Sequence, residues 1–198
     1  MSKRLFDLIA SASGLILLTP VFLVIALWIK LDSPGPVFFR QVRVGRFGKP
    51  FRIFKFRTMR TDSERAGRLT VGQNSRITRP GHFLRRYKLD ELPQLIDVLR
   101  GTMSLVGPRP EVPEFVEHYP PDIKDQVLSV RPGITDEASI AMVDENALLA
   151  RYDDPRQAYI DVVLPQKLAW YLDYVTNPSM IRDVRILFKT VHKILRRG

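Results

Sequence analysis

The chain has 198 residues, of which 31 are lysine or arginine and 21 are aspartate or glutamate, so its formal net charge is +10. This length is enough for one domain with a hydrophobic core, and an apolar content of 45% excludes a chain that is disordered throughout. The absence of cysteine excludes disulfides and thiolate metal sites. The excess of positive charge favours an anionic partner: nucleic acid, an anionic membrane surface or a phosphorylated small molecule.

The N-terminal segment, residues 5–31, is long and apolar. Its central part, from Ala10 to Ile29, carries no charged residue and meets the requirement of about 20 apolar residues for a membrane-spanning helix. A signal peptide fits poorly because no small-residue cleavage site follows the apolar run. A buried core helix also fits poorly, because a helix that is apolar on every face is difficult to cover in a small domain. We therefore expect this segment to enter a membrane.

Pro20 lies in the middle of this segment and indicates a break in the helix. A proline inside a helix removes a backbone hydrogen bond and costs about 3 kcal/mol or more, although the hydroxyl of Thr19 could satisfy part of the freed backbone. Basic residues flank the segment at both ends, and the positive-inside rule places such flanks on the cytoplasmic side. A straight helix would send one flank across, whereas a helix broken at Thr19 and Pro20 could return. The residues alone leave both arrangements open.

Residues 37–59 predict a two-stranded β-hairpin, because apolar and basic residues alternate on either side of a loop with Gly45 and Gly48. Phe51 and Ile53 would share one face of the second strand. The basic residues of this strand, Lys55 among them, could form a solvated surface or could contact phosphate. The polar residues 61–80 that follow predict a loop or a mobile segment.

Asp90 and Glu91 are adjacent acidic residues that follow a strongly basic stretch. Asp90 is a favourable N-cap, Pro93 suits a first helical turn, and apolar residues then recur at helical spacing up to Gly101. We therefore expect a helix that starts near Asp90. The pair could simply begin that helix, or it could act on a phosphate held by the basic residues and the helix N-terminus. Since neighbouring helical residues point about 100° apart, the two carboxylates would have different roles: one attacks, and the other holds a metal or moves a proton.

Two arginines downstream are placed by rigid turns. Arg109 lies between Pro108 and Pro110, and a guanidinium held in this way suits bidentate phosphate contacts. An exposed arginine in a stiff loop is the equally favoured alternative. Arg131 similarly precedes a turn in the sequence RPGIT.

The C-terminal third predicts two helices. Residues 157–175 form an aromatic-rich helical pattern, and residues 179–198 form a basic amphipathic one. The second is typical of helices that lie on anionic lipid, although a surface helix packed on the core would show a similar pattern.

Several stretches of the sequence together resemble one protein family. They are KRLFDLIAS, LDSPGPVFFRQVRVG, GKPFRIFKFRTM, LDELPQLIDVLRGTMSLVGPRPE and RPGIT, in this order between Lys3 and Thr135. They resemble the bacterial sugar transferases, the monotopic phosphoglycosyl transferases that begin glycan assembly. The resemblance implies an α+β, mainly helical fold: a re-entrant membrane helix at residues 1–31, a small β-hairpin or sheet element and several amphipathic membrane-surface helices. Residues 32–198 would form one catalytic unit.

The resemblance also implies a reaction and a location. Members transfer a phospho-sugar from a UDP-sugar to polyprenyl (undecaprenyl) phosphate and release UMP, at the cytoplasmic face of the bacterial inner membrane. The expected partners are therefore the UDP-sugar, polyprenyl phosphate and an anionic phospholipid membrane, and not nucleic acid. A basic, membrane-anchored binding protein without catalysis is the alternative, but it gives no reason for the acidic pair.

The same resemblance assigns residues to roles. It implies a covalent phospho-sugar intermediate on Asp90, with Glu91 as its partner and with Mg²⁺ held by this pair. We expect the neighbouring cations and the metal to keep Asp90 deprotonated. Thr19 and Pro20 match the Ser-Pro pair at which the family helix breaks. The basic residues that match or neighbour the family's phosphate and nucleotide contacts are Lys55, Arg57, Arg85, Arg109 and Arg131. After RPGIT the family commonly has glycine and an aromatic residue, whereas this chain has residues 136–139, DEAS.

Overall fold

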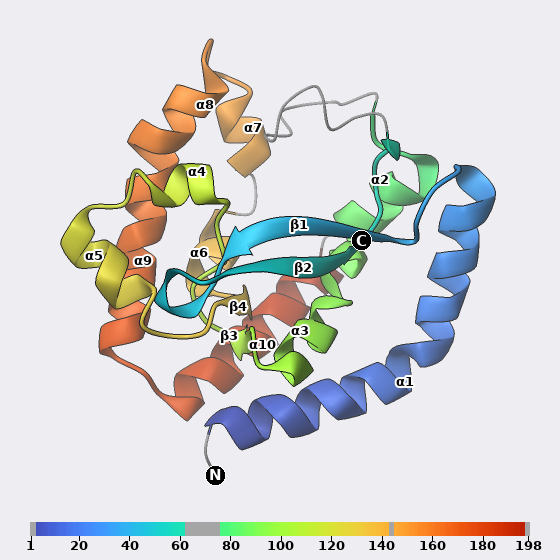
Figure 1. Cartoon of the computed structure of the whole chain (residues 1–198), viewed down its shortest axis with the longest axis horizontal. Coiled ribbons are helices and arrows are strands. Elements are labelled where there is room, and N and C mark those ends of the chain that lie inside the picture. The colour runs from blue at the N-terminus through green and yellow to red at the C-terminus, as the bar shows by residue number, and fades with distance from the viewer. Residues whose placement is uncertain (1–2, 62–75, 143–144, 197–198) are drawn as a thin grey trace.

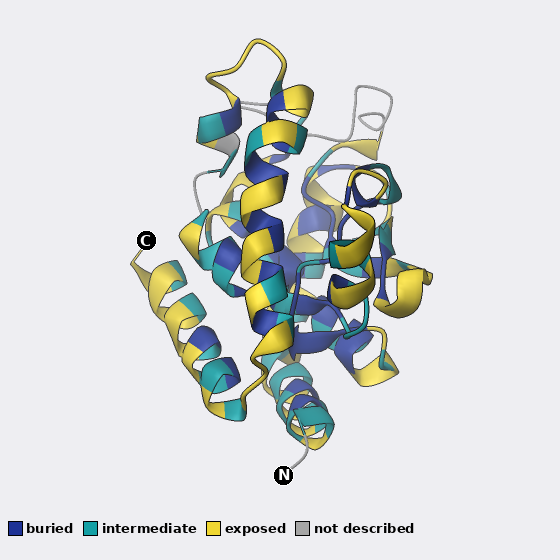
Figure 2. Ribbon diagram, turned by 90° about the vertical axis from the view of Figure 1, so that its left-hand side faces the viewer, coloured by how far each residue is buried: buried dark blue, intermediate teal, exposed yellow. Residues whose placement is uncertain are grey.

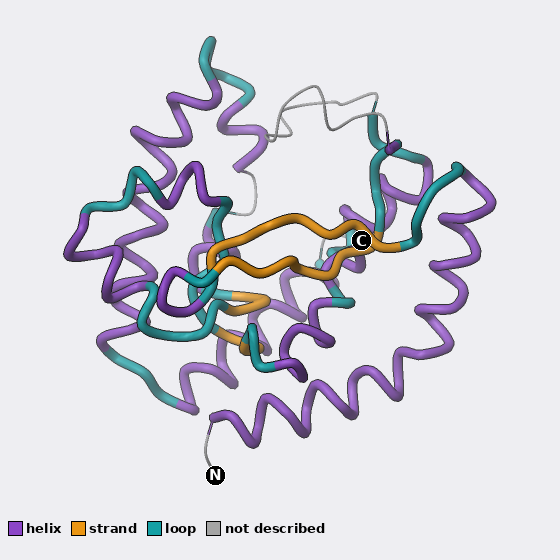
Figure 3. The backbone as a smooth tube through the Cα atoms, viewed as in Figure 1, coloured by secondary structure: helices purple, strands orange, loops and turns teal. Residues whose placement is uncertain are grey.

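The computed structural model describes residues 3–61, 76–142 and 145–196. Helices dominate, and two small sheets lie among them (Figures 1 and 3). The helices are α1 (Lys3–Asp32), α2 (Arg79–Arg86), α3 (Gln94–Arg100), α4 (Pro113–Val116), α5 (Pro121–Val127), α6 (Glu137–Ala141), α7 (Glu145–Leu149), α8 (Pro155–Ala158), α9 (Leu164–Thr176) and α10 (Met180–Leu195). The strands are β1 (Phe38–Val44), β2 (Pro50–Phe56), β3 (Ser104–Val106) and β4 (Gly133–Thr135). The prediction of a mainly helical α+β fold is confirmed.

The predicted hairpin is present. β1 and β2 pair antiparallel from Phe38 opposite Phe56 to Val44 opposite Pro50. Ile53 and Phe56 of β2 are buried, and the backbone N–H of Phe54 donates to the carboxylate of Asp97 in α3 at 2.7 Å. This contact fixes β2 against α3. Most of the polar segment predicted as a loop lies outside the described residues.

The second sheet is parallel and very short. β3 and β4 pair through Ser104 with Gly133 and Val106 with Thr135. Beyond the pair, the N–H of Gly107 donates to Thr135 O at 3.1 Å, and the N–H of Gly133 donates to Pro108 O at 2.9 Å. A Cβ on Gly133 would lie 2.1 Å from the backbone nitrogen of Gly107, so only glycine allows this approach. The sheet therefore fixes the chain just before Arg109.

α1 bends near its middle, so that it runs below the hairpin and then along one side of the molecule (Figure 1). Pro20 lies inside the helix, where a proline is a common cause of a bend. The hydroxyl of Thr19 donates to Leu15 O at 2.8 Å, rather than to Ile16 O, the carbonyl that Pro20 leaves without its helical donor. The inner face packs closely: a Cβ on Gly14 would lie 3.2 Å from Leu95 of α3. The outer face stays apolar and exposed, with Leu17 76% and Leu23 66% accessible. An exposed apolar surface of this extent is typical of membrane contact, and the protein is membrane-associated.

The helix expected at Asp90 begins later, so the prediction of Asp90 as N-cap is wrong. Lys88 adopts a left-handed conformation with φ of 57°, and a 3-10 turn, Leu89–Glu91, follows it. α3 itself begins at Gln94, with Pro93 as its N-cap residue. Gly101 ends α3 with φ of 83°, as predicted. The acidic pair therefore lies in a tight turn between α2 and α3.

The two C-terminal helices are present. The helix predicted at residues 157–175 consists of α8, a π-helical turn (Tyr159–Val163) and α9. Pro165, which has no N–H to donate, follows that turn. α10 lies at the surface beside the C-terminus (Figure 2). Ile186 of α10 is buried, but Ile181 and Phe188 are more than 70% exposed, so this helix both packs on the core and presents apolar side chains outward.

Candidate active site

Asp90 and Glu91 are both largely buried, each with 8% of its surface accessible. Their turn contacts β2 on one side and α2 on another. Burial of two adjacent carboxylates is unfavourable unless cations compensate for the lost hydration. The geometry of this site is therefore set by the basic side chains around the pair.

Glu91 is held by two cations. Lys55 of β2 donates from Nζ to Glu91 Oε1 at 2.7 Å. Arg109 makes a bidentate contact, with Nη1 at 3.0 Å from Oε2 and Nη2 on Oε1. Burial alone would raise the pKa of Glu91, but Arg109 and Lys55 outweigh it and hold that pKa well below its usual range. Glu91 is therefore ionised, with both oxygens engaged.

Asp90 is in a different situation. Among the residues that the structure describes, none donates a hydrogen bond to its carboxylate or pairs with it within salt-bridge distance. Burial and then the adjacent charge of Glu91 raise its pKa, and the opposing charges of Lys55, Lys88 and Arg85 do not cancel these effects. The expectation that the neighbouring cations and a metal together keep Asp90 deprotonated stays a prediction, and in the protein without a metal the net shift of its pKa is upward.

Arg85 reaches the pair from α2. Its Nε donates to the hydroxyl of Thr58 at 2.9 Å, and the charges of Asp90 and then Glu91 offset part of the lowering of its pKa by burial. α2 is fixed at its start by Thr78, whose hydroxyl accepts from the N–H of Gly81 at 3.1 Å. Lys55, Arg85 and Arg109 thus come from β2, α2 and the loop after β3 to one acidic turn.

Two of the predicted phosphate contacts lie elsewhere. Arg57 is buried, and its guanidinium donates to Pro34 O at 2.6 Å and to Ser33 O at 2.8 Å, just beyond the end of α1. Arg131 donates from Nε to Gly101 O at 2.8 Å and lines a cavity beside the N-terminal end of α1. The structure thus does not bring these two arginines to the acidic pair, although each lies in a motif of the resemblance.

Sequence reasoning also missed a second buried acidic group next to the site. Glu111 accepts a hydrogen bond from the hydroxyl of Tyr159, and Nζ of Lys167 lies 3.6 Å from its carboxylate. Arg43 donates to Pro110 O at 3.0 Å, which ties the strand β1 to the Arg109 segment. The only sequence signal for Glu111 is its place directly after the GPRP motif, and its partners are distant in sequence.

Asp136 was also missed as a neighbour of the site. It is buried and caps α6, with its carboxylate accepting from the N–H of Ser139 at 2.8 Å. Burial raises its pKa, while its hydrogen bonds to Ser139 and the charge of Arg109 oppose the shift. The residues DEAS that depart from the family pattern therefore form a helix start, and Asp136 at that start lies within the field of Arg109.

The donor set can be tested against Mg²⁺. In the described part of the chain, no group of three or more histidine, cysteine or acidic side chains is placed to hold a metal ion. Mg²⁺ in phosphate-handling sites commonly has only one or two carboxylate ligands, and substrate phosphates and water complete its coordination. Asp90, which has no competing partner among the described residues, fits such a set. Glu91 fits it after one of its oxygens is released from Lys55 or Arg109.

Comparison with known proteins adds independent findings. The sequence matches the family described as Bacterial sugar transferase over residues 1–197. It is 41% identical to the exopolysaccharide production protein PSS of Rhizobium leguminosarum bv. phaseoli, over 99% of this chain and 96% of that protein.

Two further relatives have names that state a reaction. One is the UDP-N-acetylgalactosamine-undecaprenyl-phosphate N-acetylgalactosaminephosphotransferase of Aeromonas hydrophila, 39% identical over 98% of this chain and 43% of that protein. The other is the UDP-glucose:undecaprenyl-phosphate glucose-1-phosphate transferase of Escherichia coli K12, 39% identical over 96% of this chain and 39% of that protein. The chain thus spans less than half the length of these two proteins.

Proposed function

Because this chain belongs to the bacterial sugar transferase family, we propose that it transfers a sugar phosphate from a UDP-sugar to undecaprenyl phosphate and releases UMP. The family membership confirms the resemblance seen in the sequence. The named relatives use different sugars, N-acetylgalactosamine and glucose, so the proposal extends to UDP-sugars as a class. The product would be the first membrane-bound intermediate of a glycan.

One observation carries this proposal: among the residues that the structure describes, Asp90 is a buried carboxylate without a bonded partner, and the cations around it could bind a diphosphate. A carboxylate in this situation can act as a nucleophile, because a cationic surrounding stabilises an anionic donor and brings the two together. Arg85 and Lys88 are the cations close to Asp90 that Glu91 does not already bind within salt-bridge distance.

The proposed reaction has two displacements at phosphorus. In the first, a carboxylate oxygen of Asp90 bonds to the phosphorus that bears the sugar, and the bond from this phosphorus to the bridging oxygen breaks. UMP leaves with the bridging oxygen. In the second, a phosphate oxygen of undecaprenyl phosphate bonds to the same phosphorus, and the bond to Asp90 breaks. Mg²⁺ held by Asp90 or Glu91 together with substrate phosphates would neutralise part of the diphosphate charge.

Glu91 has a supporting role in this scheme. Its bidentate contact with Arg109 orients the guanidinium, and its contact with Lys55 fixes the end of β2. Lys55 and Arg109 would then be oriented at the edge of the site before the substrate binds. This reduces the side-chain entropy that is lost when the diphosphate binds.

The contacts of α1 support a re-entrant helix. A straight helix of 30 residues would extend about 45 Å, longer than the hydrocarbon core of about 30 Å. Yet both ends of α1 contact the same folded unit. Near the N-terminus, Lys3 pairs with Asp183 of α10 at 2.6 Å, and at the other end Arg57 donates to residues 33 and 34. We propose that the chain is monotopic, at the cytoplasmic face of the bacterial inner membrane, with α10 on the anionic lipid surface.

The reaction can be tested by trapping its intermediate. The full chain in detergent, incubated with UDP-sugars and Mg²⁺ but without undecaprenyl phosphate, should release about one equivalent of UMP and gain the mass of the phospho-sugar on the peptide that contains Asp90. Asp90→Asn should give neither the release nor the adduct. Its matched control, Asp125→Asn, which removes an exposed carboxylate on α5, should give both. An adduct on another residue would remove Asp90 as the nucleophile. No UMP release from any common UDP-sugar, with the lipid acceptor present, would favour the non-catalytic binding protein instead.

The topology can be tested separately, since the chain has no cysteine. A single cysteine at Lys3 and one at the exposed Lys49 should both resist an impermeant thiol reagent in intact spheroplasts and react after lysis. Reaction of position 3 alone from outside would show a plain membrane span.

A further inference from the structure

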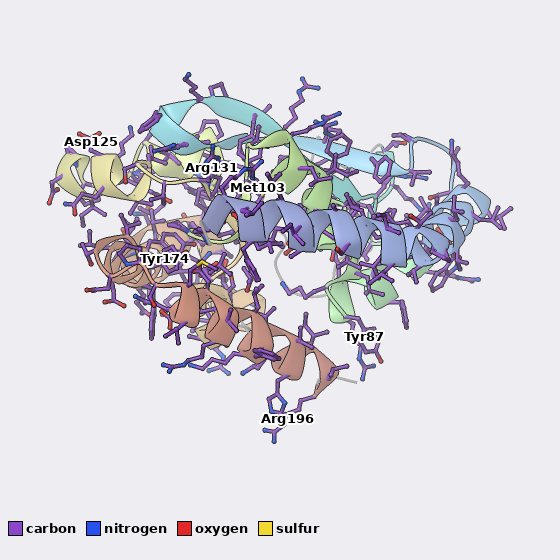
Figure 4. All side chains as sticks on the ribbon, turned by 90° about the horizontal axis from the view of Figure 1, so that it is seen from below. Tyr87, Met103, Asp125, Arg131, Tyr174 and Arg196 are labelled. Carbon is purple, nitrogen blue, oxygen red and sulfur yellow. The ribbon has the colours of Figure 1, made fainter. Side chains whose placement is uncertain are left out.

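A cavity separate from the acidic pair lies beside the N-terminal end of α1. Its volume is about 300 Å³, at the lower end of the range of small-ligand sites, which is roughly 300 to 1,000 Å³. Arg131 and Tyr174, which line it, appear close to the start of α1 in the view from below (Figure 4). The charged side chains that also line it are Lys3, Arg4, Asp7 and Arg46.

The charges of this cavity are not balanced. Four of its lining side chains are cationic, Lys3, Arg4, Arg46 and Arg131, and one is anionic, Asp7. Asp7 is buried and already accepts from the hydroxyl of Ser104 at 2.7 Å and from the N–H of Leu105 at 3.2 Å. Lys3 has its own partner in Asp183. Within the described part of the chain, the three arginines form no ion pair.

The way in which two of the arginines are anchored leaves their terminal nitrogens available. Arg131 is held through Nε by Gly101 O at 2.8 Å, and Arg46 through Nε by Ser129 O at 2.7 Å. Arg46 also stacks on the ring of Phe47. In the described residues neither Nη pair has a hydrogen-bond partner. A guanidinium fixed at Nε presents its two Nη groups as a fork, the geometry that contacts phosphate oxygens in pairs.

A purely structural role explains only part of this arrangement. Arg4 donates to Val98 O at 2.8 Å and to Leu99 O at 3.3 Å, so it caps the C-terminal end of α3, and Arg131 assists at Gly101. Arg46, however, is bonded to Ser129, which lies outside α3. Burial, followed by the like charges of Arg4 and Arg46, lowers the pKa of Arg131, so gathering these cations is unfavourable unless an anion joins them.

We propose that this cavity binds a phosphate group through Arg46 and Arg131, at a site distinct from the acidic pair. The neighbouring surface favours a membrane phospholipid as the source of the phosphate. Leu5 and Ile9 lie at the same end of α1, on the face opposite Lys3 and Asp7, and are 46% and 53% exposed, so they would hold this end of the helix, with the cavity beside it, at the lipid surface. A soluble phosphate ester would meet the same arginines without the apolar contact. The proposal does not depend on the reaction at Asp90.

The test is a binding titration of the full chain in neutral detergent with three probes: a short-chain phosphatidylglycerol, glycerol phosphate and inorganic phosphate. The variant is the double substitution Arg46→Gln and Arg131→Gln. Its control is Arg52→Gln with Arg151→Gln, which removes two exposed arginines elsewhere. We expect the double variant, and not the control, to lose at least about tenfold in affinity for phosphatidylglycerol.

The three probes separate the two sources. Tight binding of phosphatidylglycerol alone would identify a lipid headgroup site, and equal binding of glycerol phosphate would identify a site for soluble phosphate esters. Either result would support the proposal that the cavity binds phosphate. Equal affinity of the wild type and the double variant for every probe would overturn the proposal. If the double variant does not fold, the single variant Arg46→Gln serves, because Arg46 is exposed and its one side-chain hydrogen bond within the described residues is to Ser129 O.

Discussion

Glu91 and Glu111 are two buried glutamates, and each faces two cations. Glu111 lies between Arg43 and Lys167, both at 3.6 Å, and it accepts a hydrogen bond from Tyr159. Glu91 lies between Lys55 and Arg109. Burial alone would raise the pKa of each glutamate, but the neighbouring cations outweigh it, and both pKa values lie below the usual range.

The difference lies in what stands next to each glutamate. Lys167 near Glu111 also pairs with Glu145 at 2.8 Å, so the charges of that group are matched within it. Next to Glu91 stands Asp90, a second carboxylate without a bonded partner in the described structure, with a raised pKa. A cluster that satisfies all its charges holds the fold together, whereas one that leaves a carboxylate free among cations can react with a phosphate donor.

The largest expected effect is on turnover in Asp90→Asn. The amide keeps the shape of the side chain but cannot form the phospho-sugar ester, so UMP release should fall by at least about a thousandfold. Stability should not fall, because the substitution removes a buried charge that has no bonded partner in the described part of the chain. Steady-state UMP release and thermal unfolding measure the two effects. Substantial residual turnover, or a loss of stability, would mean that Asp90 has a structural role like that of Glu111 and is not the reactive carboxylate.

The second expected effect is on stability in Glu111→Gln. This change leaves Arg43 and Lys167 buried with only part of their compensating charge, and we expect a loss of about 3 kcal/mol in the free energy of unfolding. Glu91→Gln should cost less, since Asp90 is close enough to Lys55 to take over part of the pairing. Chemical unfolding in detergent micelles compares the two variants. Equal losses would mean that Asp90 gives no such compensation.

The sequence predicted those features that depend on local pattern. The alternation around Gly45 and Gly48 predicted the hairpin, and Gly101 predicted the end of α3, because strand pairing and helix termination follow from neighbouring residues. The group around Glu111 could not be found in this way, since Tyr159 lies 48 residues further along the chain. Contacts over such distances are set by the packing of whole elements.

The direction of a side chain was equally beyond the sequence. Lys55 and Arg57 are two residues apart in one motif, yet Lys55 reaches Glu91 and Arg57 reaches the end of α1. β2 ends at Phe56, so the alternation that relates residues two apart on a strand no longer applies to Arg57. The late start of α3 has a similar cause, because the left-handed conformation of Lys88 is not signalled by its residue type.

A smaller effect is expected for Arg109→Lys. Lysine keeps a positive charge near Glu91 but loses the bidentate contact, so the cation would be less well oriented toward the diphosphate. We expect kcat/KM for the UDP-sugar to fall about tenfold, with the loss greater in kcat/KM than in stability. Arg151→Lys, at an exposed position, is the matched control. A variant as active as the control would show that the fork of Arg109 does not contribute to the reaction.

The smallest expected effect is a shift in pH dependence. Asp90 must be ionised to attack, so kcat/KM should fall as the pH falls through its pKa in the folded protein, which burial and then Glu91 raise above the usual value. Glu91→Gln removes the adjacent negative charge and also frees Lys55 and Arg109 to stabilise ionised Asp90. Both changes lower the pKa of Asp90, so the acid limb of the profile should move to lower pH, even if the maximal rate is reduced. A pH profile of the first UMP release, measured without undecaprenyl phosphate, isolates this step, and an acid limb at unchanged pH would show that Glu91 does not control the ionisation of Asp90.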